Sequence, residues 1–305
     1  MIKQYFISVD GGGTKTKGVL YSKDKHIIKE ATSGYTNFYV NEKVAKKHLL
    51  EVLDELTHTL DKPYKLMIIL GISGSTGIDK TVLTSELDKR YDAKSYLYSD
   101  DVLAIHSIKK NEDKEVILMI GGTGSSVTYT IDGKVAQIGG FGHLLGDEGS
   151  AYHLSIQTLK YVIRQIEAQE SLSMLSQKVL AFIEGKTTED IKQFVYQNEK
   201  TTIANVAQVV DQLARLNDPL ALAFIDQEIK DAARQIVYAY RHMNDPKHVT
   251  IALRGGFLTK AFGVKQKIET ILKKDIKIFT LDNEAVIPNE GGYYMGLQLL
   301  REGDC

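Results

Sequence analysis

A buried strand that runs into a glycine-rich turn and then into a second strand occurs twice in this chain. The two copies read ISVDGGGT at residues 7–14 and LMIGGTGS at residues 118–125. Each copy is followed by one more strand-like segment. Two β-hairpins can look alike by chance, but the equal glycine density favours two halves of related topology. Related halves that face one another would place both glycine turns across a shared cleft.

The length of 305 residues predicts about two domains, at ~150 residues per domain. Hydrophobic residues make up 43% of the chain and charged residues 25%, which exclude a disordered chain. The formal net charge is -1, so we expect no surface-wide basic field for nucleic acid or acidic lipid. We predict an N-terminal α/β domain made of residues 1–111 and 290–305, and a larger α/β domain of residues 112–289 with a helical insertion.

The sequence carries no signal for a membrane or for secretion. No apolar run approaches the ~20 residues that span a bilayer, and the first residues lead directly into a strand-like segment. The single cysteine, Cys305, is the last residue, which excludes an intramolecular disulfide and a cysteine-ligated zinc or iron–sulfur site within one chain. These features predict a soluble, cytoplasmic protein.

Hydrophobic periodicity predicts strands and helices of α/β type in both halves. In the first half we expect strands at 5–9, 16–21, 26–31, 66–70 and 95–98, and helices at 42–60, at 80–90 and from about 102. In the second half we expect strands at 116–120, 125–130, 134–138, 249–253 and 276–280, and helices at 261–273 and 291–300. Between them, residues 150–243 are expected to be almost entirely helical.

The first glycine turn, DGGGTKTK at residues 10–17, has the composition of an anion site. Glycines let backbone N–H groups converge on phosphate oxygens, and Thr14 and Lys15 could add a hydroxyl and a charge. Asp10 ends an apolar strand, where a carboxylate is costly unless it has a role such as holding a hydrated Mg²⁺. A type I′ hairpin turn with a solvated Asp10 would explain the same residues. Neither the P-loop nor the dinucleotide-binding pattern fits.

Two more glycine motifs could contact a nucleotide. GGTGS at residues 121–125 is suited to wrapping a phosphate from the other side, and RGGF at residues 254–257 could lie flat against a purine. The RGGF motif at residues 254–257 is equally explained as a strand-to-helix turn that needs a positive φ.

Two acidic sites could serve a substrate. Asp100 follows a strand, where it is either a helix N-cap or the general base of a phosphoryl transfer. Asp147 lies in the glycine-rich loop 139–150 before a long helix, where it could bind sugar hydroxyls or, like Ser150, cap that helix. We expect His143 to be structural.

The order of these motifs, and above all GGFGHLLGDEGSAY at residues 139–152, resembles the N-acetylglucosamine kinase-like members of the BadF/BadG/BcrA/BcrD ATPase family. That family belongs to the superfamily of actin, heat-shock chaperone ATPases and sugar kinases. The resemblance implies two ribonuclease H-like domains of related topology that flank a central cleft. It also implies ATP and Mg²⁺ as cofactors. The branch of the family that shares an iron–sulfur cluster between subunits is excluded, because its cysteine pair is missing here.

The resemblance also implies roles for individual residues. Asp100 matches the catalytic base, and Asp10 would hold Mg²⁺. The implied substrate contacts are Asn37, Asp100, Thr123, Phe141 and Asp147. The implied nucleotide contacts are Gly11, Gly12, Gly13, Thr14, Lys15, Gly122, Thr123, Gly124, Gly255 and Gly256. The chain departs from the family pattern at Asp101, where an alanine is usual, at Phe141, which replaces a tryptophan, and at Ser126, which replaces an asparagine.

The implied reaction is ATP-dependent phosphorylation of an amino sugar, at the 6-hydroxyl if the sugar is N-acetylglucosamine. N-acetylmuramate, a mixed specificity for both sugars, and glucosamine stay open as substrates. A non-kinase ATPase switch is the alternative of another class. The helical stretch 154–241 offers apolar faces that a homodimer could use.

Overall fold

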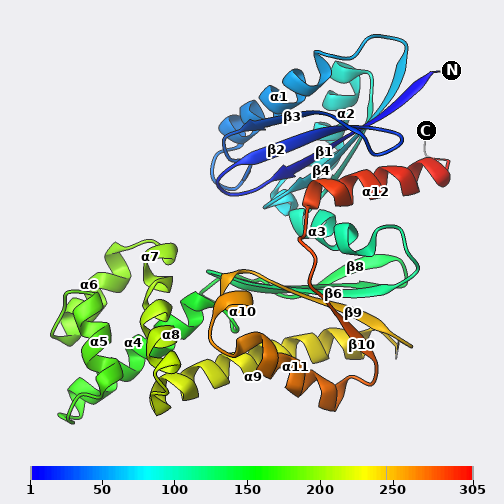
Figure 1. Cartoon of the computed structure of the whole chain (residues 1–305). Helices are drawn as coiled ribbons and strands as arrows, with labels where there is room; N and C mark the ends of the chain where they lie inside the picture. The colour runs from blue at the N-terminus through cyan, green and yellow to red at the C-terminus, as the bar shows by residue number, and fades with distance from the viewer. Residues whose placement is uncertain (1, 245, 304–305) are drawn as a thin grey trace. The chain divides into compact units, whose positions relative to one another are not determined.

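The structure is a computed structural model that describes residues 2–244 and 246–303 (Figure 1). It divides into two compact units, Met1–Lys114 with Glu284–Cys305, and Glu115–Asn283. The predicted boundary 111/112 falls in the connection before the second unit, whereas 289/290 falls inside the first turn of the last helix. Cys305 lies outside the described residues.

The first unit is built on one mixed sheet. Its strands are β1 (Lys3–Gly11), β2 (Thr16–Ser22), β3 (Ile27–Ser33), β4 (Tyr64–Ile72) and β5 (Lys94–Tyr98). Its helices are α1 (Glu42–Thr57), the short 3₁₀ helix η1 (Ser75–Gly77), α2 (Lys80–Tyr91), α3 (Asp100–Lys109) and α12 (Pro288–Arg301). The strand order is β3-β2-β1-β4-β5; β1 to β3 form an antiparallel meander, and β4 and β5 run parallel to β1.

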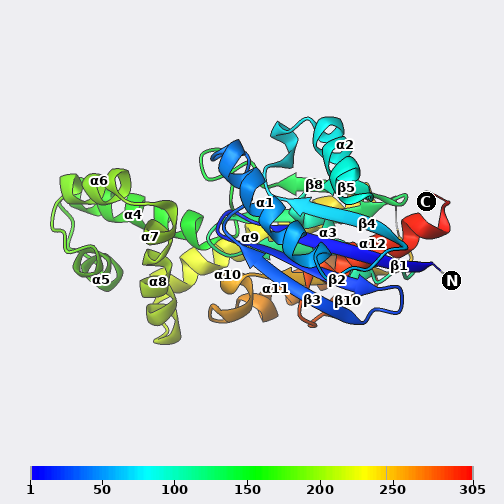
Figure 2. The same cartoon turned by 90° about the horizontal axis from the view of Figure 1, so that it is seen from above.

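Helices cover both faces of this sheet, as alternation along β1 requires. Ile7 and Val9 point into the core under α1 and α2, whereas Phe6 packs with Leu103 of α3 and Met295 of α12 on the opposite face (Figure 1). Figure 2 shows the same helices from above the sheet. Because both faces of the sheet are buried, its parallel strands are almost continuously apolar. Their positions could therefore be predicted from the sequence.

The second unit repeats this topology. Its strands are β6 (Glu115–Gly121), β7 (Ser125–Ile131), β8 (Lys134–Gly139), β9 (Val249–Arg254) and β10 (Phe279–Asp282), in the order β10-β9-β6-β7-β8. Again the first three form an antiparallel meander, and β9 and β10 run parallel to the first strand. Read from the third strand of each meander, the two sheets have the same order. The predicted pair of related α/β halves is confirmed.

Helices make up most of the second unit beyond its sheet. They are α4 (Ala151–Glu167), α5 (Met174–Phe182), α6 (Thr188–Gln197), α7 (Lys200–Ala204), α8 (Val206–Arg215), α9 (Pro219–His242), α10 (Gly256–Lys260) and α11 (Val264–Asp275). The helical prediction for 150–243 is confirmed. The strand predicted at 276–280 is shifted, because Ile276 caps α11 through a bond from its N–H to the Leu272 carbonyl (2.8 Å) and is buried with that helix.

Among the described helices, we find none that is both long enough and apolar enough to cross a membrane.

Candidate functional site

The first glycine turn is tied to the loops on both sides of it. Within the turn, the N–H of Gly12 donates to the carbonyl of Lys15 (3.0 Å). From outside, the N–H of Thr36 donates to the Gly12 carbonyl (3.0 Å), and the N–H of Ser73 donates to the Gly11 carbonyl (2.8 Å). The connections that follow β3 and β4 therefore hold the turn in place.

This turn is not of type I′. That type needs a positive φ at both central residues, and none of residues 11–15 has one. The side chains of Thr14 and Lys15 are exposed on the turn, as a role in ligand binding requires, whereas Asp10 is partly buried. The alternative of a hairpin turn of this type with a solvated aspartate is therefore wrong.

Two partly buried carboxylates lie at the carboxyl edge of the first sheet. Asp10, near the end of β1, is in register with Gly71 of β4, and Asp100 begins α3 directly after β5. Burial, and then the charge of Asp100, raise the pKa of Asp10 to about 6, against the opposing charge of Lys15. Burial also raises the pKa of Asp100, with a further contribution from Asp101.

Asp100 is not the N-cap of its helix. The N-cap of α3 is Ser99, whose side chain makes no capping bond, and Asp100 is the first helical residue. Its Oδ1 accepts a bond from the N–H of Asp101 (3.2 Å). The alternative that Asp100 is a helix N-cap is therefore wrong, and its role as the catalytic base stays a prediction.

Asn37 lies in the loop that holds the first glycine turn, one residue after Thr36. Its Oδ1 accepts a bond from the N–H of Tyr39 (3.0 Å), and its backbone carbonyl accepts one from Val40 (3.2 Å). The loop packs against Gly74, where a Cβ would come within 3.0 Å of the Asn37 side chain. Asn37 therefore belongs to the same cluster of loops as the first turn.

The second glycine turn is bonded to the start of α4. The N–H of Gly122 donates to the carbonyl of Gly124 (2.9 Å), which closes the turn. The N–H groups of Ala151 and Tyr152 donate to the carbonyls of Gly122 (2.9 Å) and Thr123 (3.2 Å). The loop 139–150 and the second turn therefore form one bonded element.

Asp147 is buried, with 4% of its surface exposed. Its Oδ1 accepts a bond from the N–H of Ser125 (3.2 Å), and its Oδ2 pairs with Nζ of Lys200 (2.6 Å). Ser150, and not Asp147, is the N-cap of α4, accepting from the N–H of His153. The predicted sugar contact of Asp147 stays a prediction.

The tip of the same loop carries exposed apolar side chains. Phe141 is 72% exposed between Gly140 and Gly142, both of which have positive φ. His143 stacks edge-on against the ring of Tyr152 at 5.1 Å, in line with the structural role expected for it. Phe141 is therefore free to contact a ligand in this conformation.

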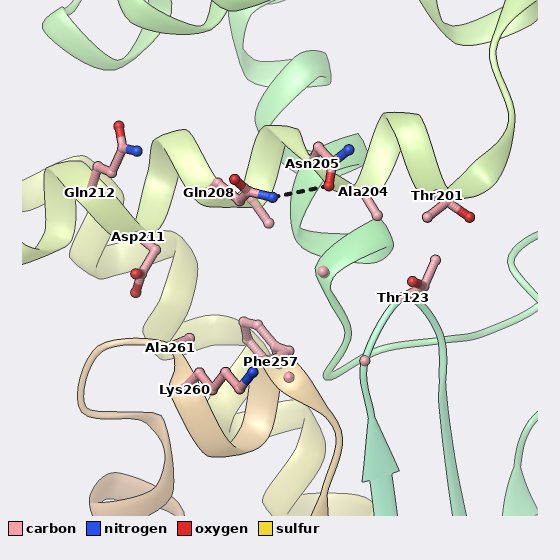
Figure 3. Close-up of a pocket in the computed structure, with 14 residues that line it drawn as sticks. Thr123, Thr201, Ala204, Asn205, Gln208, Asp211, Gln212, Phe257, Lys260 and Ala261 are labelled. Atoms are coloured by element: carbon pink, nitrogen blue, oxygen red, sulfur yellow. Dashed lines mark hydrogen bonds between the residues drawn. The ribbon is translucent and has the colours of Figure 1, made fainter.

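The second unit contains a cavity of about 540 Å³ that begins at the second glycine turn (Figure 3). Its size lies in the range of small-molecule sites. Figure 3 shows α7 and α8 on one side and α10 on the other, with Thr123 at one end. The lining residues are Gly122, Thr123, Ala151, Thr201, Ala204, Asn205, Ala207, Gln208, Asp211, Gln212, Gly256, Phe257, Lys260 and Ala261.

Sequence reasoning missed the contribution of the helical insertion to this cavity. Asn205, Gln208 and Gln212 recur at helical spacing, and Gln208 Nε2 donates to Asn205 Oδ1 (3.0 Å). That polar stripe was visible in the sequence, but it has the same pattern as an ordinary solvent-facing helix surface.

At three glycines, neither the backbone conformation nor the surrounding protein atoms exclude a side chain. Among the described glycines without a positive φ, only Gly13, Gly122 and Gly256 would carry a Cβ with no heavy atom nearer than 3.9 Å. All three lie in the predicted nucleotide motifs. By contrast, Gly255 has φ +92°, and its Cβ would collide with the Gly121 carbonyl, so its glycine is explained by backbone geometry.

The acidic groups of the first unit fit a hydrated cation. The described residues include no group of three or more His, Cys, Asp or Glu side chains that could hold a metal ion. Mg²⁺ in phosphate-handling sites uses one or two carboxylates together with substrate phosphates. Asp10, partly buried and close to the charge of Asp100, has the chemistry of such a ligand.

Solved structures with the same fold include proteins named as sugar kinases. A crystal structure from Chromobacterium violaceum, assigned as an N-acetylglucosamine kinase, matches with a TM-score of 0.70 at 22% identity, over 96% of this chain and 98% of that one. The ROK hexokinase of Thermus thermophilus matches with a TM-score of 0.60 at 13% identity, over 97% and 99%. The predicted fold class, two ribonuclease H-like α/β domains of related topology, is confirmed.

The chain belongs to the BadF/BadG/BcrA/BcrD ATPase family, whose model matches residues 7–287. It is 25% identical to the N-acetylmuramic acid/N-acetylglucosamine kinase of Clostridium acetobutylicum, over 92% of this chain and 95% of that protein. It is 26% identical to the N-acetyl-D-glucosamine kinase of Dictyostelium discoideum, over 72% and 74%.

Proposed function

We propose that this protein is an ATP-dependent amino-sugar kinase. The observation that carries the proposal is the set of glycines Gly13, Gly122 and Gly256, which leave room that no protein atom fills. A ligand that approaches the backbone closely explains their lack of a side chain. The kinase names of two relatives that align with most of this chain support the same function.

ATP would use both glycine turns and the cavity of the second unit. The cavity beside Gly256 and Phe257 would take the adenosine. The turn that the Gly122 N–H closes would bind phosphate through the backbone N–H groups of Thr123 and Gly124. Gly11 to Gly13, with Thr14 and Lys15, would bind the terminal phosphate.

Asp100 would be the catalytic base. Its carboxylate would take the proton of the attacking sugar hydroxyl while that oxygen bonds to the γ-phosphorus and the bond to the ADP oxygen breaks. Burial raises the pKa of Asp100, which increases the basicity of its carboxylate. Asp10 would hold Mg²⁺ through water, and the cation would neutralise charge on the transferring group.

The proposed substrate is N-acetylglucosamine, phosphorylated at its 6-hydroxyl, with N-acetylmuramate as the alternative. Asn37, Thr123, Phe141 and Asp147 would contact the sugar. Phe141 offers an exposed ring that could stack on a pyranose face. The predicted homodimer and cytoplasmic location stay predictions.

A coupled assay of ADP release over a panel of sugars tests the function. The panel contains N-acetylglucosamine, N-acetylmuramate, glucosamine and glucose, each with ATP and Mg²⁺. We expect one acetylated amino sugar to stimulate ADP release strongly and glucose to do little. Slow ADP release that is the same with every sugar would instead indicate an ATPase switch.

A further inference from the structure

We propose that Lys200 binds an oxyanion of the reactants beside the second glycine turn. The oxyanion is either a phosphate of the nucleotide or the carboxylate of an acidic amino sugar. The proposal deepens the kinase function above and rests on it. Neither the motifs in the sequence nor the family resemblance assigns a role to Lys200.

Lys200 reaches the turn from a distant part of the chain. Its Nζ lies 2.6 Å from Oδ2 of Asp147, and a Cβ on Gly124 would lie 2.6 Å from the same nitrogen. Gly124 has no positive φ, so backbone conformation does not require a glycine there. The missing side chain instead makes room for the ammonium group against the turn.

The ammonium group is fixed in place but still accessible. Asp147 is itself held by the N–H of Ser125, and Nζ of Lys200 lies 5.7 Å from the centre of the Tyr152 ring. A lysine ammonium has three N–H donors, and the bond to Asp147 uses one of them. The side chain remains 32% exposed, so donors remain for a ligand.

The charges around the second glycine turn favour a cation beside it when an anionic ligand binds. Residues 121–126 include no basic side chain, and the carboxylate of Asp147 adjoins the turn. A phosphate or carboxylate ligand would be repelled by that carboxylate at short range. Lys200 offsets the repulsion and can donate charge-assisted hydrogen bonds to the incoming oxyanion.

Initial rates of the full chain, with ATP varied and with N-acetylglucosamine or N-acetylmuramate as the acceptor, test the role. The variants are Lys200→Met and Lys200→Arg, with Lys192→Met as a matched control on α6 of the same helical segment. If the oxyanion is a phosphate, Lys200→Met loses about 10²-fold in kcat/KM for ATP with both sugars. If the oxyanion is a sugar carboxylate, Lys200→Met shows a similar loss in kcat/KM with N-acetylmuramate as the acceptor and no such loss with N-acetylglucosamine. Lys200→Arg keeps most of the activity in either case.

A second comparison separates ligand contact from positioning of Asp147. It sets Asp147→Asn against the double variant Asp147→Asn/Lys200→Met, in which no buried charge is left unpaired. Ligand contact predicts a further loss in the double variant. Equal kinetics of these two proteins, or a Lys200→Met enzyme as active as the Lys192→Met control, would overturn the proposal.

Binding measurements keep this test separate from that of the kinase function. The rise in melting temperature with added ATP, or with N-acetylmuramate, is compared between the wild type and Lys200→Met. The proposal expects a smaller rise in the variant for one of these ligands even if no sugar is phosphorylated. An equal rise for both ligands contradicts it.

Discussion

Replacing Asp10 by asparagine should stabilise the ligand-free protein while it removes activity. The carboxylate of Asp10 is held in a partly buried position close to Asp100, so its charged form is disfavoured in the folded state. The neutral amide has nearly the same shape and lacks that charge. The substitution therefore separates the stability of the fold from the function of the site.

The size of the effect follows from the pKa. A rise from 3.8 to about 6 corresponds to at most about 3 kcal/mol, at 1.36 kcal/mol per unit. Between these values the unfolded chain has lost the proton of Asp10 and the folded chain still holds it. The contribution of Asp10 to the stability of the wild type therefore falls as the pH rises from 3.8 to about 6 and stays low above that. At pH 5 about half of this loss in the free energy of unfolding is present.

Urea unfolding of the wild type and Asp10→Asn at pH 5 and pH 7.5, without Mg²⁺ or nucleotide, measures this difference. The free energy of unfolding of the variant should exceed that of the wild type, and the excess should be larger by about 1.5 kcal/mol at pH 7.5. Asp113→Asn, at an exposed position of the same unit, is the control. A gap between the two proteins that does not change with pH, or a less stable variant at pH 7.5, would refute the reasoning.

Three further substitutions test other parts of the account. Asp100→Asn should lower kcat by at least about 10²-fold with little change in sugar affinity, measured by calorimetry; an active variant would exclude Asp100 as the base. Gly256→Ala should keep the melting temperature and raise KM for ATP, whereas Gly255→Ala, at φ +92°, should lose about 1–2 kcal/mol in urea unfolding. Asn289→Leu should lose about 2 kcal/mol, because the buried amide donates to the carbonyls of Ser8 (2.8 Å) and Lys17 (3.0 Å); an unchanged midpoint would contradict this.

The sequence predicted the sheets because their signal is local. The glycine turns after β1 and β6 mark the same point in each half, and the apolar runs of β4 and β9 are typical of parallel strands covered on both faces. The predicted strand at 276–280 was misplaced because Ile276 is buried by the end of α11. Apolar character alone does not say which neighbour buries a side chain.

The acidic residues of the first unit could also be identified from sequence. Asp10 and Asp100 both follow apolar strands, and the carboxyl edge of a sheet brings such residues together. Their electrostatic coupling, and the burial that raises both pKa values, depend on packing and could not be predicted.

The roles of Lys200 and of α8 in lining the cavity could not be predicted from the sequence, for a different reason. Lys200 meets Asp147 only because the helical insertion folds back over the second turn. One lysine on a polar helix has many partners that sequence cannot distinguish. The role of Gly124 had the same difficulty, because its neighbour in space is Lys200 and not another residue of the motif.

Direct detection of the phosphorylated product tests the central claim best. The purified protein is incubated with ATP, Mg²⁺ and N-acetylglucosamine or N-acetylmuramate, and ³¹P NMR follows the phosphorus as ADP accumulates. A sugar phosphate monoester should form in equal amount to ADP, and Asp100→Asn should form it at least about 10²-fold more slowly. Release of ADP with inorganic phosphate alone, whatever sugar is present, would contradict this claim.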